Sequence, residues 1–206
     1  MIRAALRELG GGEYATSEDL EVEVQGWFDL SGLRSDADLL VWLTGPTLPS
    51  LQHAYERLRA SDFGRCIEPV WSNAANLAPH ELLPVYEPAV GGAPKKFITV
   101  YPVNRSERWY QQPESHQHEA LTEWGSKLNS SPDSSVTVGS ALGLGDYDWI
   151  SVVEADDLTV LAQQIHEIRT VRSSMHVRAE TPVFTGTRIE LADWADFQPQ
   201  SDFDLE

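Results

Sequence analysis

Two parts of the chain repeat the same order of polar and apolar positions. Residues 36–43 open with an acid-rich turn and run into an apolar stretch, and residues 146–153 do the same. Behind each stretch, leucine and isoleucine recur at helical spacing, from Leu48 to Leu58 and from Leu158 to Ile168. Residues 69–72 and 182–185 then match as short Pro-Val-aromatic segments. With an offset of about 110 residues, this predicts two tandem copies of one supersecondary unit.

Each copy reads as strand, turn, strand, helix, strand. The first strand-turn pair spans residues 21–30 and 31–36, and its counterpart spans residues 135–142 and 143–146. The second copy also opens with a strand at 97–101 and a helix at 113–128, with Pro113 tolerated in the first turn. The resulting β-α-β-β-α-β order is the ferredoxin-like unit. Because so few residues precede position 21, the first copy is expected to lack its opening strand.

The chain therefore divides into an N-terminal half, a linker, a C-terminal half and a tail. We place the N-terminal half at residues 1–78 and the linker, rich in proline with a Gly-Gly pair, at 79–96. The C-terminal half spans 97–190 and carries the predicted ligand pocket. Residues 191–206 are acidic and, past the first of them, without periodicity, so we expect a mobile tail that docks on a neighbour through Trp194, Phe197 or Phe203.

Charge and composition narrow the range of partners. The net charge is −17, from 32 acidic and 15 basic residues, and such a surface repels the phosphate backbone of nucleic acids. No apolar stretch is long enough to cross a membrane, and the N-terminus lacks the apolar core of a signal peptide. The single cysteine, Cys66, excludes an internal disulfide. We expect a cytoplasmic protein without nucleic-acid or membrane partners.

Histidine and tryptophan residues are the first candidates for a metal site or a ligand pocket. None of the six histidines stands in a metal-binding spacing, and His116 and His118 would lie on different faces of a helix, so no metal site is predicted. Of the seven tryptophans, four are expected to pack the core: Trp27, Trp42, Trp71 and Trp149. Trp109 and Trp124 fit two roles about equally well: packing in the core, or forming the wall of an apolar pocket.

Several stretches in order are similar to a known family. Residues 100–125, VYPVNRSERWYQQPESHQHEALTEWG, resemble the signature of the chlorite dismutase superfamily, and within it the coproheme decarboxylases of actinobacterial type. Supporting stretches lie at 27–42, 63–72, 144–150 and 176–186, so the resemblance covers residues 21–190. It implies an α+β fold of dimeric α+β barrel type, with two ferredoxin-like halves, a barrel-like antiparallel core and flanking helices. It also implies a ring-shaped homo-oligomer, a pentamer, that holds haem or coproheme in the second half.

The resemblance carries roles to individual positions. Tyr101 matches the tyrosine that forms a radical and attacks a propionate, and is the predicted catalytic residue. Arg105 matches a basic residue that faces a propionate, a role that suits a guanidinium. The remaining matches in the predicted ligand site are Trp109, Arg169 and Ser174.

The sequence departs from the family where iron would be bound. Trp124 occupies the position of the proximal histidine, and an indole nitrogen has no lone pair free to coordinate iron. The distal histidine position reads Leu82, with His80 nearby. Trp124 therefore joins the predicted ligand-binding residues, and iron ligation must differ from the family pattern.

Three hypotheses on function follow. The first is a divergent oxidoreductase or decarboxylase that binds haem or another tetrapyrrole with altered iron ligation. The second is a haem-free enzyme repurposed for a small substrate, and the third is a non-catalytic binding subunit. A Soret band in the purified protein separates the first hypothesis from the other two.

Overall fold

The computed structural model describes residues 21–77, 83, 86–128, 130–171 and 176–198. The chain forms two compact units, each assembled from segments that are distant in sequence. One consists of Met1–Asp29, Leu39–Val70 and Arg188–Glu206, and the other of Leu30–Asp38 and Trp71–Thr187. None of the helices in the described ranges is long and apolar enough to span a membrane.

The first unit contains a β-hairpin that is followed in sequence by two helices, and a third helix near the C-terminus joins them. Strands β1 (Glu23–Asp29) and β2 (Leu39–Thr44) pair antiparallel, from Glu23 opposite Thr44 to Asp29 opposite Leu39. Helix α2 (Leu48–Ala60) begins at Thr47, whose side chain and that of Ser50 form a capping box. The short helix α3 (Asp62–Arg65) follows it. The apolar core of this unit is made by Trp27, Leu58, Phe63 and Leu191.

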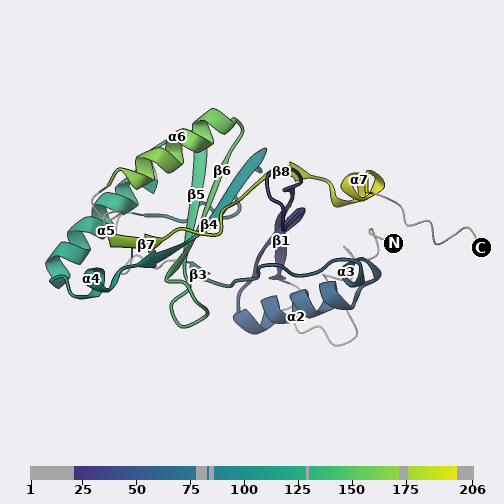
Figure 1. The fold of residues 1–206 in the computed structure, drawn as a ribbon, viewed down its shortest axis with the longest axis horizontal. Helices are drawn as coiled ribbons and strands as arrows, with labels where there is room; N and C mark the ends of the chain where they lie inside the picture. Colours follow the sequence, from purple (N-terminus) through teal and green to yellow (C-terminus); the bar gives the residue numbers. More distant parts are fainter. Residues whose placement is uncertain (1–20, 78–82, 84–85, 129, 172–175, 199–206) are drawn as a thin grey trace, which may run out of the picture. The chain divides into compact units, whose positions relative to one another are not determined.

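The second unit is built on an antiparallel sheet (Figure 1). Its central strands are β4 (Phe97–Arg105) and β6 (Trp149–Ala155), which pair over seven residues of each strand, from Phe97 to Val103 and from Trp149 to Ala155. Strand β5 (Ser134–Ser140) lies beyond β6, and the two-residue strand β3 (Asn76–Leu77) pairs with the end of β5. On the other side of β4 lie β8 (Phe184–Ile189) and β7 (Val177–Ala179).

Two long helices cover one face of this sheet. Helix α5 (Glu114–Leu128) follows the short helix α4 (Glu107–Tyr110), and helix α6 (Leu158–Arg169) begins at Asp157, whose carboxylate caps the Thr159 N–H. Figure 1 shows α5 and α6 side by side across the strands. Apolar residues of both helices and of the inner face of the sheet form one core, among them Tyr101, Val103, Trp124, Leu128, Val136, Trp149, Leu161 and Ile168.

The outer edge of β4 is interrupted in the middle. Residues Phe97 to Val100 pair with β8, and Asn104 and Arg105 pair with β7, so the pairing on this edge stops around Pro102. A proline has no N–H to donate, which suits it to a break in a ladder. The chain between β7 and β8 crosses this gap, and it includes Glu180.

The predicted α+β class with antiparallel sheets is confirmed. The two hairpins are equivalent, because Leu39 opens β2 opposite Asp29 and Trp149 opens β6 opposite Ser140. The helix behind each hairpin is also present, as α2 and α6. The expected absence of a first strand falls before residue 21, outside the described residues. The predicted division into halves, linker and tail stays a prediction.

Two local expectations were wrong. Residues 69–72 form no strand, although residues 184–185 of the matching segment 182–185 lie in β8. After residue 72 the chain joins the sheet at β3. The predicted tail opens as helix α7 (Leu191–Asp196), because Leu191 and Trp194 pack into the core of the first unit. Phe197 is 87% exposed, and Phe203 lies outside the described residues.

Candidate functional site

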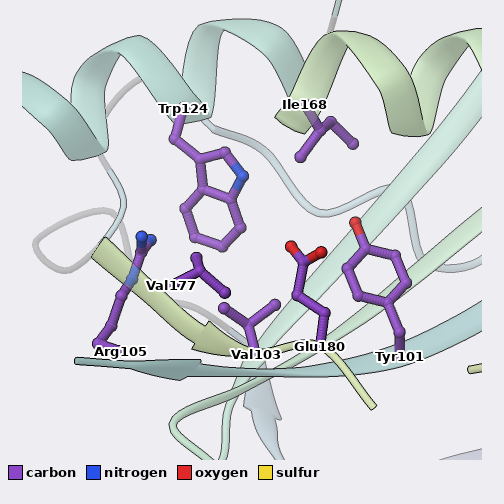
Figure 2. Close-up of a pocket in the computed structure, with 7 residues that line it drawn as sticks. All are labelled: Tyr101, Val103, Arg105, Trp124, Ile168, Val177 and Glu180. Carbon is purple, nitrogen blue, oxygen red and sulfur yellow. The ribbon is translucent and has the colours of Figure 1, made fainter. Parts of the chain in front are cut away.

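A small cavity lies between β4 and the helices of the second unit. It is lined by Tyr101, Val103, Arg105, Trp124, Ile168, Val177 and Glu180, which Figure 2 shows converging from the strands below and the helices above. The cavity volume is about 10 Å³, which is the space of about one water molecule. It combines apolar walls with a phenol, a guanidinium and a carboxylate.

Strand β4 supplies three of these side chains because of its two-residue period. Tyr101, Val103 and Arg105 alternate along one face of the strand, which is the face under α5 and α6. The pairing with β6 fixes this register, with Tyr101 opposite Ser151. The strand predicted at 97–101 is present and extends to Arg105, so it carries Tyr101 and Arg105 together.

The Tyr101 phenol is held in its neutral form. Its side chain is 1% exposed, and neither its hydroxyl nor that of Ser151 has a hydrogen-bond partner of normal geometry among the described residues. Burial first and the negative charge of Glu180 second raise the pKa of Tyr101 well above the usual range, against smaller lowering by Ser151 and Arg169. The hydroxyl can therefore donate a hydrogen bond to an acceptor in the cavity.

Arg105 is a buried cation between two indoles. Its guanidinium carbon lies 4.6 Å from the ring centroid of Trp109 and 5.1 Å from that of Trp124. Burial lowers the pKa of Arg105 to about 10, against smaller raising by Asp148, so the group remains charged near neutral pH. Its backbone N–H donates to Asp148 Oδ2 at 2.6 Å, which holds the end of β4 in place. Cation–π contacts of a desolvated guanidinium stabilise this position.

Trp124 enters the cavity from α5. It is 3% exposed and packs edge-to-face on Trp149, with ring centroids 5.9 Å apart. Figure 2 shows the indole pointing from the helix toward the strands, with Arg105 on one side and Glu180 and Tyr101 on the other. Trp124 therefore fills space at the centre of the site. Trp109 contacts Arg105 but is not part of the cavity wall.

Arg169 takes part indirectly, through a residue that the sequence analysis missed. Its Nε lies 2.8 Å from Oε2 of Glu180, and its guanidinium carbon lies 6.0 Å from the Tyr101 ring centroid. Arg169 is about half exposed and does not line the cavity, whereas its neighbour Ile168 does. Glu180 belongs to the family-like stretch 176–186, but no periodicity marks it. Its position depends on the pairing of β7 with a distant strand.

The remaining predicted positions cannot be placed relative to the cavity. Ser174 lies outside the described residues, as do Leu82 and His80. The ligand-binding and catalytic roles assigned to Tyr101, Arg105, Trp109, Trp124, Arg169 and Ser174 stay predictions.

The site suits one part of a haem and not another. A buried cation, a neutral phenol and two indoles suit the carboxylates and the flat ring of a tetrapyrrole. Ligation of iron from α5 does not fit, because the side chain that enters the cavity from this helix is an indole. No described histidine lines the cavity, and the described residues contain no cluster of three or more potential metal ligands.

Comparison with known proteins places the chain in a family. The family model described as chlorite dismutase matches residues 4–189. A coproheme decarboxylase from Mycolicibacterium smegmatis is 36% identical over 177 residues, which cover 84% of this chain and 77% of the relative. The solved structure of a mutant chlorite dismutase from Candidatus Nitrospira defluvii has a TM-score of 0.72 at 18% identity, covering 85% of this chain and 78% of that one. A heme-binding protein from Thermus thermophilus has a TM-score of 0.73 at 19% identity, covering 95% of this chain and 82% of that one. These two structures share the fold, and the two sequence matches show that the chain belongs to the chlorite dismutase family.

Proposed function

We propose that this protein is a divergent coproheme decarboxylase-like member of its family that binds haem, coproheme or a related tetrapyrrole with altered iron ligation. The observation that carries the proposal is the buried Arg105 cation, whose guanidinium contacts two indole rings. Arg105 lies on the same strand as Tyr101. A buried cation and a neutral phenol in the same cavity favour a ligand that brings carboxylates to the site. We propose the activity of an oxidoreductase or a decarboxylase, which the relation to the coproheme decarboxylase of Mycolicibacterium smegmatis supports.

The residues of the cavity would divide the recognition of such a ligand between them. Arg105 supplies the charge that a carboxylate pairs with, and Tyr101 supplies an O–H donor. Trp124 supplies a flat apolar surface on which a ring can stack. Because the cavity holds about one water molecule, the Trp124 side chain has to leave its present position when a macrocycle enters.

We also propose a homo-oligomeric, cytoplasmic protein, a pentamer in the first instance. What supports the assembly is the family resemblance of residues 21–190. A second candidate, a haem-free enzyme for a smaller substrate, is favoured by one observation: an indole stands at the centre of the cavity.

Replacement of Trp124 tests the proposal directly. We expect the wild type to bind metal-free coproporphyrin, which quenches its tryptophan fluorescence, and to bind haemin weakly with a broad Soret band. Trp124→His restores a nitrogen lone pair and removes bulk, so haemin affinity should rise about tenfold or more, with a sharper Soret band.

The matched control is Trp124→Phe, which removes the indole without adding a donor. It should leave the Soret band broad. A wild type that binds haemin tightly, with the spectrum of histidine ligation, would contradict the altered ligation. If neither metal-free coproporphyrin nor haemin binds to the wild type or to Trp124→His, tetrapyrrole binding is wrong and the haem-free candidate replaces it.

A further inference from the structure

Glu180 is the one carboxylate among the described residues that line the cavity. Arg169 forms an ion pair with it at 2.8 Å. Figure 2 shows the Glu180 side chain pointing into the cavity on the side of Tyr101. Its negative charge is, after burial, the second cause that raises the pKa of Tyr101, and it offsets a small part of the lowering of the Arg105 pKa by burial. Glu180 therefore already acts as an anion within a site whose other polar groups suit an anion.

The placement of Glu180 follows from the break in the edge of β4. Strand β7 ends at Ala179 and β8 begins at Phe184, and between them the chain crosses β4 near Pro102. Glu180 is the first residue of this crossing. Its side chain is 21% exposed, so its carboxylate lies at the boundary between the cavity and solvent.

A second carboxylate in the same cavity would be unfavourable. Two like charges a few ångströms apart in a partly buried site repel by an amount that corresponds to at least about tenfold in affinity. A ligand carboxylate that approaches Tyr101 meets Glu180, and Arg169 is already paired with Glu180.

We propose that Glu180 is an internal competitor that occupies the place of a ligand carboxylate and gives up Arg169 to the ligand when it binds. Glu180 thereby determines specificity: it disfavours ligands that bring only one carboxylate to Arg105, and it admits those with a second carboxylate that can replace its own on Arg169. This inference rests on the proposed tetrapyrrole binding and adds a selection among carboxylate-bearing ligands.

The test is Glu180→Gln, which keeps the size of the side chain and removes its charge. We expect metal-free coproporphyrin, measured by quenching of tryptophan fluorescence, to bind the variant about tenfold more tightly than the wild type. Benzoate, a probe with one carboxylate, should also bind the variant more tightly, and by a larger factor, because it cannot replace Glu180 on Arg169. Glu119→Gln is the matched control, because it removes the same charge from an exposed position of α5 and should leave both affinities unchanged.

The outcomes separate this inference from the proposed function. Equal or weaker binding of both probes by Glu180→Gln overturns the competitor role, even where coproporphyrin binding itself is confirmed. Equal gains for benzoate and coproporphyrin overturn the selection by carboxylate number. If coproporphyrin binds neither protein, tetrapyrrole binding fails, and the competitor role is then decided by benzoate alone: tighter binding by the variant supports it, and unchanged binding overturns it.

Discussion

Burial of the Tyr101 hydroxyl without a hydrogen-bond partner in the described chain carries a cost for the folded state. A buried hydroxyl that has lost its contacts with water destabilises a protein by about 1–3 kcal/mol unless a partner compensates. Tyr101 lies on the central strand of the sheet, where a phenylalanine would pack equally well. A polar group kept at such a position is typical of a binding or catalytic role.

We expect Tyr101→Phe to be as stable as the wild type or more stable by up to about 2 kcal/mol, while its affinity for metal-free coproporphyrin falls. The measurements are urea unfolding and fluorescence quenching. A loss of stability larger than about 1 kcal/mol would show that the hydroxyl has a structural partner and would remove the argument for a ligand.

The difference in stability between the wild type and Tyr101→Phe depends on pH. The pKa of Tyr101 is raised in the folded protein, so the unfolded chain loses its phenolic proton first, near pH 10. Ionisation of this group therefore leaves the free energy of unfolding unchanged below about pH 10 and lowers it as the pH rises above that value. At about pH 11 the wild type should therefore lose about 1 kcal/mol more than Tyr101→Phe does, relative to neutral pH.

At the scale of elements, a second tyrosine completes the edge of a strand. The Tyr86 hydroxyl donates to the Val136 carbonyl at 3.1 Å and accepts from the Val138 N–H at 2.6 Å. Both groups belong to β5, whose outer edge is covered by β3 only at Gly139 and Ser140. The Tyr86 side chain thus satisfies two backbone groups of β5 that a neighbouring strand would otherwise bond.

Tyr86→Phe should destabilise the protein by about 1–3 kcal/mol, because it leaves a buried backbone N–H without its acceptor. Burial raises the pKa of Tyr86 to about 12, so the wild type also loses stability between about pH 10 and pH 12. Urea unfolding of Tyr86→Phe beside Tyr101→Phe checks this: Tyr86→Phe should be clearly the less stable of the two at neutral pH. Equal stabilities would contradict the role of Tyr86 at the edge of β5.

The elements that the sequence predicts well are those with a strong local period. Residues close together in sequence determine the helical spacing of Leu158, Leu161 and Ile168. They also determine the hairpins that precede both helices. Residues 69–72 resembled a strand because their composition matches that of 182–185, but strand formation depends on a partner. The partner of Phe184 is Val100 of β4, whereas residues 69–72 pair with no strand of the described chain.

The candidate site was predictable in part, for a related reason. Tyr101 and Arg105 follow from a family-like motif on one strand, and Trp124 from the helix after it. Glu180 could not be predicted, because nothing near it in sequence determines which way it faces. Its direction depends on pairing between β4 and β7, which are far apart along the chain.

At the scale of the whole molecule, the net charge of −17 opposes association between copies. Such repulsion is screened over about 10 Å at an ionic strength of about 0.1 M. The proposed ring should therefore be most stable at moderate to high salt.

Light scattering should give a mass several times the 23.0 kDa of one chain, with dissociation favoured by low salt. A single species of 23.0 kDa across the salt series would contradict the oligomer. Dissociation favoured by high salt would instead indicate an interface made by ion pairs.

The interruption along β4 has a consequence for how easily the site can rearrange. Residues 180–183 cross the gap between the β7 and β8 ladders, and the Arg34 Nη1 hydrogen bond to the Val183 carbonyl, at 2.9 Å, secures the far end of the crossing. Moving Glu180 aside would break a half-exposed ion pair, which contributes about 0–1 kcal/mol, and no rung of either ladder. The opening would thus be a local fluctuation with a free energy far below that of global unfolding. Exchange of one carboxylate for another could then proceed while the sheet stays intact.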